Sequence, residues 1–124
     1  MDEELCGEVH SLDQSLGFLI AIIAGVLLSF QGLLVQREGL CAQLADEEPD
    51  LSCLYPIRHT ASSLVAGALA FFLCLSARAS AQADPADPVA VCSGRSNLIA
   101  SVLVFLAAAI RFDDVEFLHA NGRL

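Results

Sequence analysis

Apolar residues gather along the chain in three runs that polar and charged segments separate. The first run, residues 16–35, is twenty residues long and contains no charged side chain. A helix rises about 1.5 Å per residue, so this run would be roughly 30 Å long, which matches the hydrocarbon thickness of a bilayer. The pattern therefore predicts a membrane-spanning helix at residues 16–35.

The second and third apolar runs carry weaker signals. The run at 59–77 is long enough to span, but His59, Thr60 and several serines oppose its insertion, so we expect a neighbouring helix to support it. The uncharged core of the third run, residues 98–110, has only thirteen residues. We predict a third span at 97–112. The alternative is two spans and one interfacial helix, because thirteen residues are short for a clean crossing.

Polar segments delimit these runs within a single all-α domain, residues 1–124. They comprise an acidic N-terminal tail (1–11) and two loops (36–58 and 78–96). Ser11 and Gln14 have the spacing of a capping box, which predicts that the first helix begins near Leu12.

The ends of the other predicted elements are marked by further local signals. The first helix is expected to close at 36–39, with a short separate helix around 39–45. Two prolines at 84–88 predict a surface linker, since proline removes a backbone donor. Ser96 or Asn97 is expected to cap the third helix.

Composition favours the membrane interpretation. Hydrophobic residues make up 56% of the chain, mean hydropathy is +0.64, and only 17% of residues are charged. A soluble domain is nearer 45–50% apolar and about 25% charged. A soluble helical bundle remains a third possibility, although so short a chain would struggle to hide this much apolar surface. The start of the chain lacks a basic segment, which indicates a retained span rather than a cleaved leader.

Charge excludes one class of partner and indicates an orientation. Fifteen acids against six arginines give a net charge of -9, which argues against nucleic acid as a ligand. With three spans, the tail and second loop carry two arginines, whereas the first loop and C-terminus carry four. The positive-inside rule then places the protein in the cell membrane with its N-terminus outside and its C-terminus in the cytoplasm.

The cysteines divide between the two sides of this topology. Cys6 and Cys92 share one side, Cys41 and Cys53 share the other, and Cys74 lies within the membrane. With the N-terminus outside, Cys6 and Cys92 form the candidate disulfide. With the opposite orientation Cys41 and Cys53 do, and five free thiols are the simpler interpretation.

Side chains that could take part in catalysis form no pattern typical of an enzyme. The chain has no C-x-x-C motif, no Ser, His and Asp set with geometric support, and no glycine-rich phosphate loop. Cys6 and His10 stand four apart, but a structural zinc ion needs four ligands. We expect a protein that is not an enzyme and that holds no metal or cofactor.

Small residues recur on one face of each of the first two helices. Such faces let helix backbones approach closely in lipid, where the hydrophobic effect no longer favours association. The predicted packing residues are Gly17, Ala21, Gly25, Ser29 and Gly32 in the first helix, and Ser62, Ala66 and Ala70 in the second.

These patterns predict how the protein works, in outline. We expect a multi-pass integral membrane protein that acts as an accessory or assembly subunit through helix packing. Its partners would be the lipid bilayer and either a second copy or another membrane protein, because three helices bury little protein surface. A subunit of a small channel or transporter is the alternative. Gln31 is then the polar residue of interest, since no charged residue lies within the runs.

Overall fold

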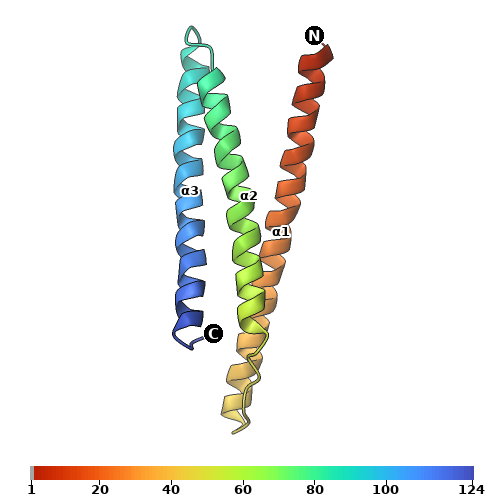
Figure 1. Ribbon diagram of the computed structural model, residues 1–124, viewed down its shortest axis with the longest axis vertical. Coiled ribbons are helices and arrows are strands. Elements are labelled where there is room, and N and C mark those ends of the chain that lie inside the picture. The colour runs from red at the N-terminus through yellow and green to blue at the C-terminus, as the bar shows by residue number, and fades with distance from the viewer. Residues whose placement is uncertain (1) are drawn as a thin grey trace.

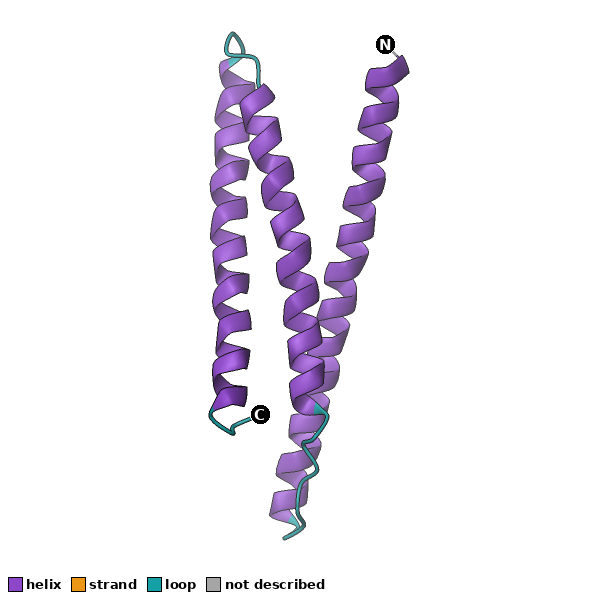
Figure 2. Ribbon diagram, in the orientation of Figure 1, coloured by secondary structure: helices purple, strands orange, loops and turns teal. Residues whose placement is uncertain are grey.

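The protein is a bundle of three long helices. The computed structural model describes residues 2–124, and this part of the chain contains no strand. The helices are α1 (Asp2–Leu44), α2 (Leu54–Gln82) and α3 (Pro88–Ala120) (Figure 2). The expected all-α class is therefore confirmed.

Helix α2 lies between the other two and packs antiparallel against both (Figure 1). Within residues 2–124, no Cα atom of α1 lies within 8 Å of a Cα atom of α3. The N-terminal half of α1 diverges from α2, so that the three helices form an open V (Figure 1). The N-terminus and the α2–α3 turn lie at the open end, and the C-terminal half of α1 lies at the closed end.

The helix α1 begins earlier than the sequence predicts. It starts at Asp2, so the acidic tail is helical and the expected start near Leu12 is wrong. Three acids occupy the first turn, where negative charge interacts favourably with the helix dipole. Ser11 is not a cap, because it lies inside the helix and its carbonyl accepts a hydrogen bond from the Ser15 hydroxyl at 2.9 Å.

The same helix also ends later than predicted. It passes through residues 36–39 without a break, and the short helix expected around 39–45 is its last turn. Gly39 is buried there against the loop that leads into α2, where a Cβ at residue 39 would lie 2.8 Å from Leu51 Cδ2 and 3.5 Å from Pro49 Cβ. Glycine has a low helix propensity, which predicts a helix end at this position, but packing against the loop keeps Gly39 inside the helix.

A tight turn at residues 83–87 joins α2 to α3, where the prolines predicted a linker. The Asp87 side chain accepts hydrogen bonds from the amides of Val89 and Ala90 at 3.1 and 3.2 Å, and Pro88 opens the helix. Aspartate before proline is a favourable helix start, because the carboxylate satisfies free amides and proline lacks one. The cap expected at Ser96 or Asn97 is therefore wrong, since both lie inside α3.

Buried positions recur every seven residues on all three helices. A seven-residue repeat keeps one narrow seam facing a neighbour along the length of a helix. Most members of the seams are small, so the backbones approach closely. The buried residues are Gly25, Gly32 and Gly39 on α1, Leu54, Ala61 and Ala68 on α2, and Ala108 and Val115 on α3.

Apolar surface remains exposed over most of the protein. The accessible surface is 8893 Å², whereas a compact soluble monomer of this mass would expose about 6,400 Å². Two helices, α1 and α2, are long and apolar enough to cross a membrane, and only 11% of the apolar window of each is buried inside the protein. The residues of the predicted third span, 97–112, all lie within α3, and their crossing stays a prediction.

Candidate functional site

Helices α1 and α2 approach each other closely at Gly25. A Cβ on this residue would lie 2.7 Å from Val65 Cγ2 and 3.2 Å from the Ala61 carbonyl oxygen. Two turns further along α1, Gly32 faces Ile57 with more room, since its added Cβ would lie 3.5 Å from Ile57 Cγ2. Glycine at residue 25 is thus required by the close approach of α1 and α2.

Other members of the predicted packing faces have different surroundings. Gly17 lies where α1 has diverged, and its added Cβ would have no atom within 4 Å. Ala21 is half-buried, and the exposed Ser29 donates its hydroxyl to the Gly25 carbonyl at 2.9 Å. On α2, the predicted residues Ser62, Ala66 and Ala70 are half-buried.

The α2 residues that meet the glycines differ from the predicted stripe. Gly25 and Gly32 face Ile57, Ala61 and Val65. The signal that would have found this register is the seven-residue spacing of Gly25, Gly32 and Gly39, rather than the four-residue spacing of small residues.

Small polar residues join α2 to α3 inside the predicted spans. The hydroxyls of Ser76 and Ser101 are hydrogen-bonded at 2.8 Å. Nearer the turn, a Cβ at Gly94 would lie 3.3 Å from the Ser80 Cα, so the two backbones are close. Interhelical hydrogen bonds of this kind stabilise helix pairs in lipid modestly.

A polar cluster joins the other end of the α2–α3 pair, at the edge of the predicted spans. Tyr55 donates its hydroxyl to both carboxylate oxygens of Glu116, at 3.0 and 3.1 Å, and His59 Nδ1 lies 2.5 Å from Glu116 Oε1. The His119 ring stacks on Tyr55 with centroids 3.5 Å apart. The cluster fixes the register of α2 against α3 at this end.

The sequence analysis did not predict this cluster, because its residues come from two helices that are distant in the chain. The available signal was the spacing within each helix: residues 55 and 59 share a face, as do 116 and 119. In the structure, the hydrogen bond with His59, followed by the smaller effect of the Tyr55 hydroxyl, holds the pKa of Glu116 below its usual 4.5.

A groove opens toward the closed end of the V, between α1 and α3 and over α2. It consists of two adjoining cavities of about 360 and 470 Å³ that share Ser29, Ser62 and Arg111 in their walls. The smaller cavity, which has the more polar lining of the two and is called the polar cavity below, adds Gln36, Arg58 and Asp114, among others. The larger is mainly apolar and is lined by Ile22, Val65, Leu69, Val104, Ala107 and Ala108 as well.

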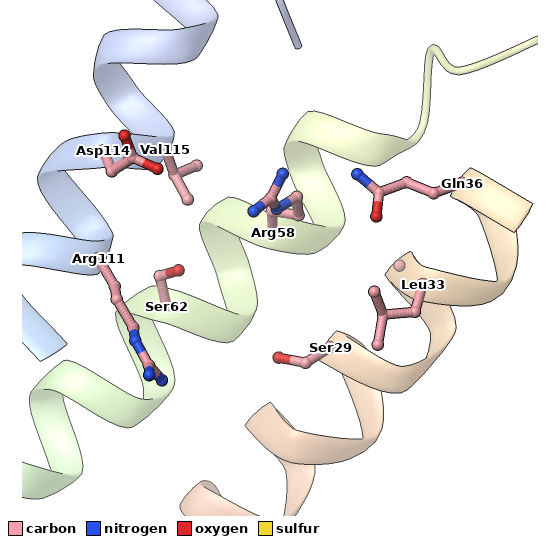
Figure 3. A pocket seen from close by; sticks show the side chains of 9 residues that line it. Ser29, Leu33, Gln36, Arg58, Ser62, Arg111, Asp114 and Val115 are labelled. Atoms are coloured by element: carbon pink, nitrogen blue, oxygen red, sulfur yellow. The ribbon is translucent and has the colours of Figure 1, made fainter.

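Two arginines from different helices face the polar cavity. Figure 3 shows Arg58 on α2, the Arg111 side chain extending from α3 across α2, and the Gln36 side chain of α1 directed toward Arg58. Across residues 2–124, His59 with Glu116 forms the one ion pair within 4.0 Å. Neither guanidinium therefore has a carboxylate partner there, although Asp114 lines the same cavity.

Cysteines and metal ligands make no assembled site in residues 2–124. All five cysteines lie in this range and are exposed and unpaired. Cys6 lies near the start of α1 and Cys92 near the start of α3. The N-terminal half of α1 diverges from the other two helices (Figure 1). A disulfide between Cys6 and Cys92 stays a prediction, and it would require α1 to approach α3. The described part of the chain contains no group of three or more His, Cys, Asp or Glu placed to hold a metal ion.

Comparison with protein-family models, with curated proteins and with solved structures found no match for the chain.

Proposed function

We propose that this chain is a multi-pass integral membrane protein that works as an accessory or assembly subunit. The observation that carries the proposal is the exposure of the two candidate spans. Nine large apolar side chains between residues 16 and 35 are exposed, and 11% of each apolar window is buried. The core helix of a soluble protein would bury its apolar face, so lipid and other helices are the fitting surroundings for these surfaces.

The free side of α1 supports the assembly role. In residues 2–124, α2 is the one helix against which α1 packs, and the aromatic contact between them is the stacking of Phe18 on Phe71, with centroids 4.1 Å apart. Gln31 lies within the predicted span, is exposed, and makes no side-chain hydrogen bond to another described residue. An amide in lipid gains stability from a partner across a helix contact.

Extraction and self-association measurements test the two parts of this proposal. Carbonate treatment of membranes should leave the protein in the pellet, and recovery in the aqueous fraction would contradict the membrane placement. In mild detergent the purified chain should self-associate or retain a partner membrane protein. Gln31→Leu should weaken that association about three- to tenfold, the range expected for one interhelical hydrogen bond.

Gln14→Leu is the matched control for this experiment. Gln14 is exposed on the same helix but lies outside the predicted span. Equal loss of association in both variants, or a wild-type chain that is strictly monomeric and without a partner, would contradict the assembly role.

A further inference from the structure

We propose that the groove between α1 and α3 binds an anionic phospholipid, with the phosphate beside Arg58 and Arg111 and an acyl chain along the apolar cavity. The inference rests on the membrane placement proposed above and adds a ligand to it. It depends on three observations: the charge of the polar cavity, its depth relative to the spans, and the apolar space that continues from it.

The polar cavity is suited to a single phosphate. Arginine forms forked hydrogen bonds that match phosphate oxygens, and the two guanidinium groups come from different helices. Two arginines and Asp114 give the cavity a net charge of +1, which one phosphodiester would neutralise. Ser62 and Gln36 add neutral donors to the same wall.

The arginines stand at the level where lipid headgroups lie. Arg58 immediately precedes the predicted span at 59–77, and Arg111 is next to the last residue of the predicted span at 97–112. Because α2 and α3 are antiparallel, these two positions share one end of the bundle. Gln36 follows the span at 16–35, so the α1 wall reaches the same level.

The apolar cavity continues from this level toward the membrane centre. It shares Ser62 and Arg111 with the polar cavity and then follows Ala61, Val65 and Leu69 along α2. Its volume of about 470 Å³ lies in the usual range of small-molecule sites. A charged compartment joined to an apolar one fits an amphiphile, whereas an apolar partner helix would leave the net positive charge of the polar cavity uncompensated.

Native mass spectrometry of the purified full-length chain in a neutral detergent tests the proposal. After removal of native lipid, the wild type should retain phosphatidylglycerol at least about tenfold more strongly than phosphatidylcholine, given the strength of charge-assisted hydrogen bonds. The double variant R58Q/R111Q should lose this preference. Equal retention of the two lipids by the wild type would overturn the proposal.

The double variant R78Q/R95Q is the matched control. It also removes one arginine from α2 and one from α3, but both residues lie toward the opposite end of the pair, outside the groove. It should retain phosphatidylglycerol like the wild type. Loss of binding equal to that of R58Q/R111Q would show attraction by net charge and would overturn the site.

Two further arms keep the result interpretable. Inorganic phosphate, added at the same concentration, should displace little phosphatidylglycerol; full displacement would show a free-anion site and overturn the lipid assignment. If R58Q/R111Q fails to fold, Arg111→Lys takes its place. Lysine keeps the charge but not the forked hydrogen bonds of arginine, so an intermediate loss of phosphatidylglycerol binding is expected. No loss in Arg111→Lys would then count against the proposal. Carbonate extraction tests the membrane placement separately, so the two failures are distinguishable.

Discussion

Gly25 lies so close to Val65 that a single added methyl at residue 25 would come within 2.7 Å of Val65 Cγ2. The same methyl would lie 3.2 Å from the Ala61 carbonyl oxygen, which belongs to the backbone and cannot rotate away. Small residues hold the α1–α2 contact close at this point. Because α1 and α3 do not pack against each other, the α1–α2 contact also determines the position of α1 as one wall of the groove.

Gly25→Ala should therefore destabilise the bundle. Overpacking a close contact costs about 1–3 kcal/mol, which exceeds the gain of up to about 1 kcal/mol from replacing a helical glycine by alanine. Thermal unfolding in mild detergent, followed by circular dichroism, should show a lower midpoint for the variant than for the wild type.

Gly17→Ala and Gly32→Ala are matched controls for that measurement. At Gly17 the new methyl meets nothing within 4 Å, and at Gly32 it meets ordinary contacts of 3.5 Å and more. Both variants should unfold at or above the wild-type midpoint because alanine favours the helix. A Gly25→Ala midpoint equal to theirs would contradict the close approach of α1 and α2.

The hydroxyl pair of Ser76 and Ser101 should contribute measurably to the α2–α3 contact. A double-mutant cycle of Ser76→Ala and Ser101→Ala should give a coupling energy of about 0.6 kcal/mol, the average for interhelical hydrogen bonds in membranes. The corresponding cycle of Ser29→Ala with Ser101→Ala should give none, because these helices do not touch. Equal coupling in the two cycles would mean that the serine hydrogen bond is not specific.

Stability should depend on pH through Glu116. Its pKa is lowered in the folded protein, chiefly by the hydrogen bond with His59, so the carboxylate form is favoured there. The carboxylate therefore stabilises the folded protein fully at a pH above the pKa of the unfolded state, near 4.5. This stabilisation is lost as the pH falls through the lower pKa of the folded state. The wild-type unfolding midpoint should fall over that acidic range.

Glu116→Gln isolates this contribution from that of the other acids. Glutamine keeps the shape of the side chain and can still accept a hydrogen bond from Tyr55, but it does not titrate. The midpoint difference between wild type and variant should be constant above the usual pKa and shrink in acid. A difference that does not change with pH would contradict the proposed role of the Glu116 carboxylate.

The number of spans can be determined with a cysteine at the C-terminus. If α3 crosses the membrane, Arg123→Cys places the new thiol on the side of Cys41 and Cys53. If α3 lies in the interface, the new thiol stays with Cys6 and Cys92. Co-labelling of residue 123 with Cys41 by an impermeant maleimide is the predicted result, and co-labelling with Cys92 would contradict a third span.

The fold class was predictable from the sequence because it depends on local periodicity and length. The uncharged run at 16–35 requires a helix, and the linker prolines require a turn. Helix ends were less predictable: Gly39 is covered by Leu51 and Pro49 from the following loop, which is a tertiary effect. Asp87 followed by Pro88 is a recognisable helix start. The polar segment 78–96 was instead interpreted as a loop, and the cap of the third helix was therefore expected at Ser96 or Asn97.

The candidate groove and polar cluster depend on register between helices, which composition and spacing do not determine. Arg58 and Arg111 are far apart in the chain and line one cavity only because α2 and α3 are antiparallel (Figure 1). Likewise, Tyr55 reaches Glu116 across 61 positions of the chain. The seven-residue repeat of buried glycines was visible in the sequence and is the one feature from which the α1–α2 seam could have been predicted.

Labelling of the native cysteines tests the membrane placement most directly. The four loop and tail cysteines, Cys6, Cys41, Cys53 and Cys92, are exposed and unpaired in the structure. In intact cells under a reductant, an impermeant maleimide should modify Cys6 and Cys92 together, or Cys41 and Cys53 together, and all four should react after lysis. Labelling of one cysteine from each pair, or of none until the cells are lysed, would contradict a protein that crosses the membrane with α1 and α2.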